Sequence, residues 1–237
     1  MSGQHLLPDW LQKVLPSDEL VITTRRVGRG EEKEYEKLPF REKTEVVCDP
    51  CNTRWMGDLE NEAKPFLIPP IIRQPCRVDS TAQILMAKWA LMTTLVFQAH
   101  RPASRIAPPA HYSYLRRLGV PSRQITIWLG SHVRARDDPV NSVYAHEPLA
   151  LEPLDDEAEI SQGMGYLSFL AVGGISFTLV GHSYRNQTEI TCDRGIAEAL
   201  IQVWPVQNAA INWPPPLMMD RDLMDALPGS MTVRIAP

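Results

Sequence analysis

The sequence predicts an α+β protein, in which a small strand–strand–helix head precedes a larger α+β domain with an antiparallel sheet. Three observations predict this class. Strand-like and helix-like segments are grouped along the chain, one segment alternates cleanly between apolar and polar residues, and Gly173-Gly174 separates two apolar runs as in a hairpin. Proline accounts for 21 of the 237 residues, which favours short elements and excludes a long-helix protein.

The head is predicted within residues 1–70. Its expected elements are a short helix over 8–15, strands over 20–27 and 44–48, and a helix over 52–63. The charge run between the two strands is expected to be a long, solvated connection. Pro65, Pro69 and Pro70 are expected to end the last helix, because proline lacks the N–H that a helix interior needs.

The larger domain is predicted over residues 80–237, with a boundary near 70–80. Ser80 is the expected N-cap of a helix that reaches Gln98 and is apolar nearly all round, so this helix should be central. The other expected elements are a helix over 112–118, a half-buried strand over 124–136, a hairpin of 166–172 with 175–182, a strand over 200–204, an irregular run through 213–216 and a helix over 220–227.

Composition excludes several classes of protein. Apolar residues make up 44% and charged residues 22%, which is typical of a globular chain. The net charge is −4, so the chain lacks the excess of cations that non-specific nucleic-acid binders carry. The N-terminus shows no signal peptide, the most apolar run (82–97) is too short to span a bilayer, and no phosphate-loop motif indicates a small-molecule cofactor. We therefore expect a cytoplasmic protein with no membrane span.

Cys48 and Cys51 form a CxxC pair between a predicted strand and a predicted helix. Two thiolates at this spacing can bind one Zn²⁺, but a structural zinc site has four ligands, so the pair supplies half of one. A redox motif is the rival interpretation, although no βαβ pattern follows as in thioredoxin-like proteins. Two unliganded cysteines are the third interpretation. Cys76 and Cys192 are isolated in the sequence and are expected to be core thiols.

The context of the CxxC pair resembles an HNH endonuclease-like family of uncharacterised bacterial proteins. The segments that carry the resemblance are His5-Leu6-Leu7-Pro8-Asp9-Trp10-Leu11 and Cys48-Asp49-Pro50-Cys51-Asn52, followed by Trp55-Met56 and Leu59-Glu60. Weaker similarity continues through Lys88-Trp89-Ala90, Gln202 to Pro205 and Trp213 to Pro215. The resemblance implies that the head is a ββα-metal or treble-clef-like fold stabilised by zinc.

The same resemblance implies metal-assisted hydrolysis of phosphodiester bonds, with DNA as the expected partner. In this comparison His5 is the general base and Asn52 is a catalytic contact to metal or phosphate. Cys48 and Cys51 are the zinc ligands, Mg²⁺ or Mn²⁺ is the catalytic ion, and Arg54 is a candidate contact to nucleic acid. The alternative is a zinc-stabilised binding or scaffold module without catalysis.

The chain departs from the family pattern at three places. The first CxxC is absent, because Met1 lies only four residues before His5. Gln4 stands where an acid is expected, and Lys43-Thr44-Glu45 stands where the central Asn of the motif is expected. These departures leave two hypotheses: the head is a degenerate relative, or the missing cysteine pair lies upstream of Met1. Residues 1–60 hold nine Lys and Arg against twelve Asp and Glu, so the head itself is acidic.

Overall fold

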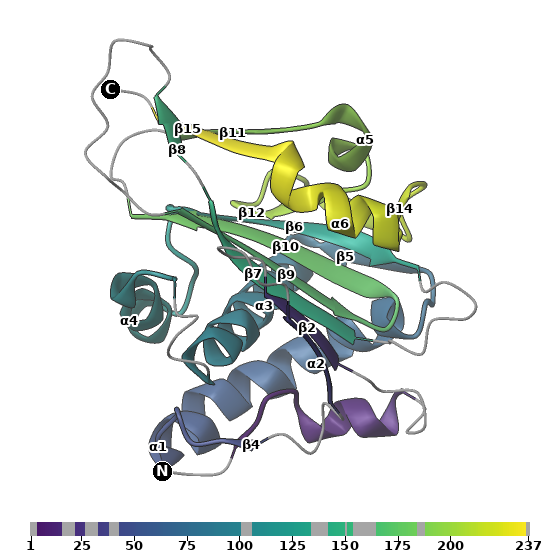
Figure 1. Ribbon diagram of the computed structural model, residues 1–237. Helices are drawn as coiled ribbons and strands as arrows, with labels where there is room; N and C mark the ends of the chain where they lie inside the picture. The colour runs from purple at the N-terminus through teal and green to yellow at the C-terminus, as the bar shows by residue number, and fades with distance from the viewer. Residues whose placement is uncertain are drawn as a thin grey trace.

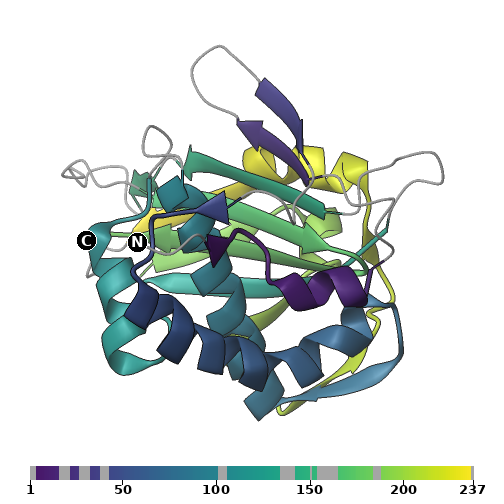
Figure 2. The ribbon, with the colours of Figure 1, turned by 90° about the horizontal axis from the view of Figure 1, so that it is seen from below.

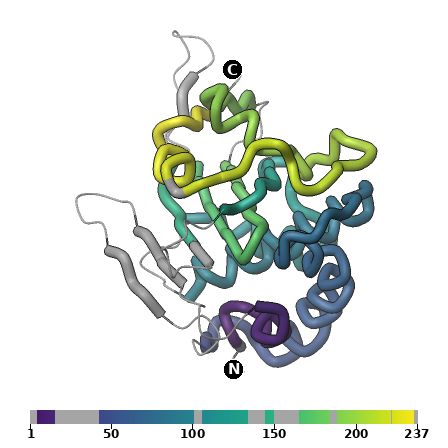
Figure 3. Tube along the Cα trace, turned by 90° about the vertical axis from the view of Figure 1, so that its right-hand side faces the viewer, coloured from purple at the N-terminus to yellow at the C-terminus, as the bar shows by residue number. Residues whose placement is uncertain are grey.

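The computed structural model describes residues 4–15, 22–26, 33–37, 43–100, 106–133, 142–149, 151–153, 165–183 and 188–235. The α+β class predicted from the sequence is confirmed. A large sheet lies between a layer of helices and a second layer that contains the C-terminal strands and helices (Figure 1). Seen from the side, the N-terminal segment and the C-terminal elements lie at opposite ends of the molecule (Figure 3).

The main sheet has eight strands among the described residues, in the order β12-β6-β10-β9-β7-β2-β3, with β14 beside β6. These strands are β2 (Ile22–Arg26), β3 (Lys33–Lys37), β6 (Ile125–His132), β7 (Ser142–Leu149), β9 (Gly165–Val172), β10 (Ile175–His182), β12 (Ile201–Trp204) and β14 (Met218–Met219). β2 runs parallel to β7 and β14 runs parallel to β6, whereas the other neighbours are antiparallel. The sheet is therefore mixed, with an antiparallel centre.

The β9–β10 hairpin forms the middle of this sheet, as Gly173-Gly174 predicted. Every residue of both strands is buried, and alternate side chains enter two separate cores. Leu170 and Phe177 face the helical layer, whereas Phe169 and Val180 face the C-terminal layer. Burial on both faces explains why these strands are almost continuously apolar.

The alternating segment, predicted as a strand over 124–136, forms β6 over Ile125–His132. Ile125, Ile127 and Leu129 belong to the core on the helical side. The opposite face is also covered, because Trp128 packs into the second core and β14 pairs with the end of β6. The remainder of the predicted strand, from 134 to 136, lies outside the described residues.

The central helix is α3 (Ser80–His100), which packs between the sheet and α2 (Figure 2). Its N-cap differs from the prediction: the carboxylate of Asp79, rather than Ser80, accepts a hydrogen bond of 2.8 Å from the Ala82 N–H. The expected helix over 112–118 is present as α4 (Pro109–Leu118), which ends at Gly119 in the left-handed conformation.

The helix of the head is longer than predicted. α1 (Asp49–Cys51) continues through a π-helical turn, η3 (Asn52–Met56), into α2 (Gly57–Ile71). The prediction that prolines end this helix was wrong. Leu59, Ala63, Leu67 and Ile71 form a buried stripe, and this packing holds the helix through the three prolines. At the end of α2, the carbonyl of Ile71 has no partner within the helix. It accepts a hydrogen bond of 2.8 Å from the Gly174 N–H of the hairpin turn.

The head also contains β1 (Gln4–His5), which pairs antiparallel with β4 (Lys43–Thr44), and a short 3₁₀ helix, η1 (Asp9–Lys13). The segment that was expected to be a long, solvated connection contains a strand, because β3 lies within it and pairs with β2. β3 is the last strand in the order of the sheet, where a charged sequence discourages further pairing. The boundary near 70–80 stays a prediction, although residues from both sides of it share one core.

The C-terminal layer covers the second face of the main sheet. It contains a three-stranded sheet in the order β11-β15-β8, together with two helices. The elements are β8 (Leu151–Pro153), β11 (Thr188–Cys192), α5 (Arg194–Ala197), α6 (Arg221–Ser230) and β15 (Met231–Ile235). The expected irregular run begins instead with β13 (Ala210–Trp213), which pairs with β5 (Cys76–Asp79). This pairing joins segments that are far apart in the sequence.

We predict that Gly173→Ala destabilises the protein by about 2–4 kcal/mol, because Gly173 combines a positive φ of 59° with a tight contact. A Cβ at this position would lie 2.5 Å from the carbonyl oxygen of Ile71. Gly195→Ala is the matched control, because a Cβ there meets nothing within 4 Å and the residue lies in a helix. Urea unfolding of the two variants measures the difference, and equal stabilities would contradict this role of the hairpin turn.

Candidate functional site

His5 forms a short polar contact at the N-terminal edge of the head. Its Nδ1 lies 2.7 Å from an Oδ1 of Asp9, one helical turn further along the chain. The local sequence explains this geometry: Leu6 and Leu7 are buried as anchors, and Pro8 precedes the 3₁₀ helix that begins at Asp9. The side chain of His5 is 23% exposed, so the imidazole is positioned by a carboxylate and still reaches solvent.

Glu60 of α2 adds a second carboxyl group next to this pair. Burial and, as the smaller cause, the negative charge of Asp9 raise the pKa of Glu60 from its ordinary value of 4.5 to about 7. η1 and α2 also meet at a cation–π contact, in which the Lys64 ammonium of α2 lies 5.7 Å from the centre of the Trp10 ring of η1. The N-terminal edge of the head therefore carries one imidazole and two carboxyl groups, of which Glu60 has a raised pKa.

Cys48 and Cys51 lie at the start of the α1–η3–α2 helix. Cys48 is the exposed N-cap residue and Cys51 is a buried residue of the first turn, with its N–H donating to the Cys48 carbonyl at 3.0 Å. Hydrogen bonds from the Cys51 thiol and backbone N–H lower the pKa of the Cys48 thiol, and the nearby Arg116 guanidinium acts in the same direction. The pair is therefore a polarised dithiol rather than an ordinary core pair.

Asn52 and Arg54 lie in the π-helical turn that follows. Asn52 is half-buried, and Arg54 is exposed with backbone angles (φ −109°, ψ −106°) that are not helical. Thr53 Oγ1 donates to the Asp49 carbonyl at 2.8 Å and secures the turn. π-helical turns occur often at functional sites. Here the turn orients Arg54 toward solvent, where it is available to a ligand.

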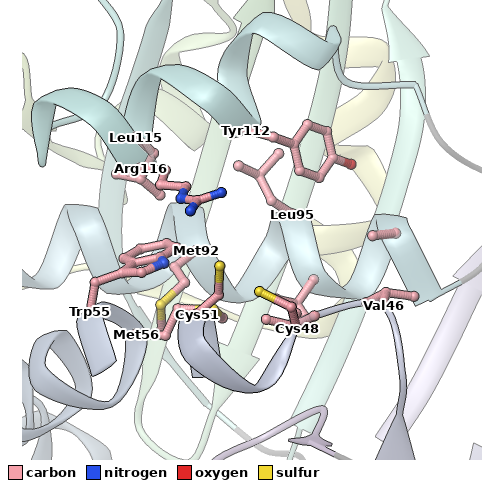
Figure 4. A pocket seen from close by; sticks show the side chains of 13 residues that line it. Val46, Cys48, Cys51, Trp55, Met56, Met92, Leu95, Tyr112, Leu115 and Arg116 are labelled. Carbon is pink, nitrogen blue, oxygen red and sulfur yellow. The ribbon is translucent and has the colours of Figure 1, made fainter. Parts of the chain in front are cut away.

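A pocket of about 330 Å³ opens beside the dithiol (Figure 4). The head, α3 and α4 all contribute to it, and most of its surface is apolar. Its apolar lining includes Val46, Val47, Met56, Met92, Leu95 and Leu115. Its polar groups are the two thiols, Trp55, Tyr112 and Arg116. Neither His5 nor Asn52 belongs to the described lining, so the structure separates the dithiol pocket from the His5 pair.

Zinc and a catalytic divalent ion were expected from the resemblance, and both need His, Cys, Asp or Glu ligands. Within the described ranges, no three His, Cys, Asp or Glu side chains are grouped as a metal site. Cys48 and Cys51 lie together, but they supply two of the four ligands of a structural zinc site. Cys76 and Cys192 lie in β5 and β11, and burial raises the pKa of both thiols. The His, Cys, Asp and Glu side chains of the described ranges thus do not complete a zinc or magnesium site.

Three residues of the site were not identified from the sequence. Asp9 follows His5 by four positions, and this spacing within a predicted helix start is a signal that could have found it. Glu60 appeared to be an ordinary polar residue of an amphipathic helix, because only the tertiary packing buries it. Arg116 lies on α4, and no local pattern connects it to the dithiol.

Comparisons with protein-family models, with curated proteins and with solved structures found no match to this chain. The helices in the described part of the chain include none that combines the length and apolar character needed to cross a bilayer.

We predict that the free energy of unfolding contains a contribution from Glu60 that falls as pH rises. The folded pKa of about 7 lies above the ordinary value of 4.5, so between these values the folded protein keeps a proton that the unfolded chain has released. Glu60→Gln should therefore be more stable than the wild type by about 1–3 kcal/mol at about pH 8, and similar to it at about pH 4.

Glu62→Gln is the control for this measurement, because Glu62 is exposed on the same helix. Urea unfolding at several pH values measures all three proteins. A Glu60→Gln variant whose pH dependence matches that of the wild type and of Glu62→Gln would show that Glu60 is not buried near Asp9 as described.

Proposed function

We propose that the chain is an HNH endonuclease-like protein that hydrolyses phosphodiester bonds of DNA in the cytoplasm. The observation that supports this most strongly is the 2.7 Å contact between His5 Nδ1 and Asp9 at the edge of the antiparallel β1–β4 pair. This pair precedes a helix whose first turn carries the CxxC motif. The order of strand, strand and helix is the one that the resemblance implies for a nuclease head.

In this proposal His5 is the general base. When Nδ1 donates a hydrogen bond to Asp9, Nε2 is left with its lone pair to accept a proton from a water molecule. The water oxygen then forms a bond to phosphorus as the bond from phosphorus to the leaving oxygen breaks. The leaving oxygen takes a proton, and Glu60 is the group suited to supply it because its pKa is raised to about 7.

Nearby cations are the proposed contacts to the phosphate. Lys43 is the register partner of His5 in the β1–β4 pair and is exposed. Arg54 is exposed in the π-helical turn, and Asn52 in the same turn remains a proposed contact. The resemblance also implies Mg²⁺ or Mn²⁺, for which the described residues do not supply a complete set of ligands.

We predict that His5→Ala lowers the rate of nicking of supercoiled plasmid DNA by about 100-fold or more, because a general base typically contributes at least that much. Asp9→Asn should lower kcat by about tenfold with little change in KM, because Asp9 positions the base rather than binding DNA. Asp58→Asn is the control, since Asp58 is exposed on α2. Assays with Mg²⁺, with Mn²⁺ and with a chelator measure the rates, and equal nicking by His5→Ala and wild type would refute the proposal.

The second candidate function is a zinc-stabilised binding or scaffold module without catalysis. The observation that favours it is the position of the dithiol, whose thiols line a pocket with α3 and α4 rather than with His5. In this case Cys48 and Cys51 serve stability or binding, and the His5 pair has no chemical role.

This candidate predicts zinc in the purified protein, bound through Cys48 and Cys51, which supply two of the four ligands of a structural site. Metal analysis should show that Cys48→Ser and Cys51→Ser lose the zinc, whereas Cys76→Ser keeps it. Zinc retained by Cys48→Ser would exclude the dithiol as its ligand. Zinc binding together with no DNA cleavage under any metal would favour the module over the nuclease.

A further inference from the structure

The dithiol pocket has the size and composition of a small-molecule site. Its volume of about 330 Å³ lies within the range of natural ligand pockets, which are mostly apolar with a few polar groups that fix orientation. One wall comes from α3, which is buried in the core, and another from the first turns of the head helix, of which Cys51 and Met56 are buried. Met92, Leu95 and Leu115 line the pocket with apolar side chains and are otherwise buried.

Two polar groups of this pocket, the Trp55 indole N–H and the Arg116 guanidinium, can donate hydrogen bonds but cannot accept them. Nε1 of Trp55 is buried and has no hydrogen-bond partner among the described residues. Arg116 is exposed on α4, and no carboxylate of the described ranges pairs with it. Figure 4 shows the Arg116 guanidinium and the Trp55 indole nitrogen on the same side of the pocket, near Cys51. A buried N–H without an acceptor is unfavourable, so a ligand that supplies an acceptor would relieve it.

We propose that this pocket binds a small organic carboxylate with an apolar body. The carboxylate accepts hydrogen bonds from the Arg116 guanidinium and the Trp55 indole N–H, and a guanidinium is well suited to a planar oxyanion. The apolar body lies against Met92, Leu95 and Leu115. Its transfer from water to this apolar surface is favourable. Charge complementarity with Arg116 selects an anion over a neutral alcohol of the same length.

This site is independent of the proposed nuclease and zinc functions. None of its three principal contacts, Arg116, Trp55 and Leu95, belongs to the His5 pair, and the carboxylate needs no thiol as a donor. His5→Ala therefore distinguishes this site from the proposed nuclease: it should lower the rate of DNA nicking and leave carboxylate binding within about twofold of the wild-type affinity.

Isothermal titration of the full chain with octanoate tests the proposal, with octanol as the neutral probe. We expect saturable binding of one octanoate per chain, with octanol at least about tenfold weaker. Arg116→Gln should weaken octanoate binding by about tenfold and remove the preference over octanol. Arg117→Gln should leave both unchanged, because Arg117 is exposed on the same helix and its Nε donates to the Ser113 carbonyl.

Trp55→Phe gives a second measurement, because it keeps the aromatic ring and removes the N–H. This variant should bind octanoate several-fold more weakly, and the indole N–H resonance that it lacks should be the one that shifts when octanoate is added to the wild type. Absence of saturable octanoate binding, equal affinity for octanol, or equal losses in Arg116→Gln and Arg117→Gln would each overturn the proposal.

Discussion

The burial of α3 on all sides is the constraint on which the rest of the structure depends. A helix that is apolar all round cannot be stable unless every face is covered, and here the sheet, α2 and α4 cover it. Two buried glutamines secure its ends. Gln83 donates to the carbonyls of Val78 and Asn208, and Gln98 donates to Ser168 while it accepts from the Ala107 N–H. These bonds fix the helix between distant parts of the chain.

The positions of both sites follow from this arrangement. Because α2 must cover α3, its buried stripe keeps it helical through three prolines, and its N-terminal turns are held in place. The start of this helix brings Cys48 and Cys51 against α3 and α4, where they border the pocket. Further along, Glu60 and Lys64 meet η1, which carries Asp9 and Trp10. One helix therefore builds a thiol-lined pocket and supports a His–Asp pair at separate places.

The sequence predicted the elements whose signals are local. The hairpin around Gly173-Gly174, the apolar helix that begins at Ser80 and the start of β6 follow from turn chemistry and periodicity, and each is present. Elements that depend on distant partners were missed. β3 is a strand because β2 offers it an edge, and β13 is a strand because it pairs with β5. The same holds for the site, since the burial of Glu60 and the approach of Arg116 arise only from tertiary packing.

The central functional claim is that Asp9 fixes the imidazole of His5 with Nε2 available as a base. The most direct test is nitrogen NMR of the histidine rings, with the His5 signals assigned by their loss in His5→Gln. We expect the neutral ring of His5 to carry its proton on Nδ1, toward Asp9, and Asp9→Asn to disturb this preference. A neutral His5 protonated on Nε2 in the wild type would contradict the claim, because Nε2 could not then accept a proton from water.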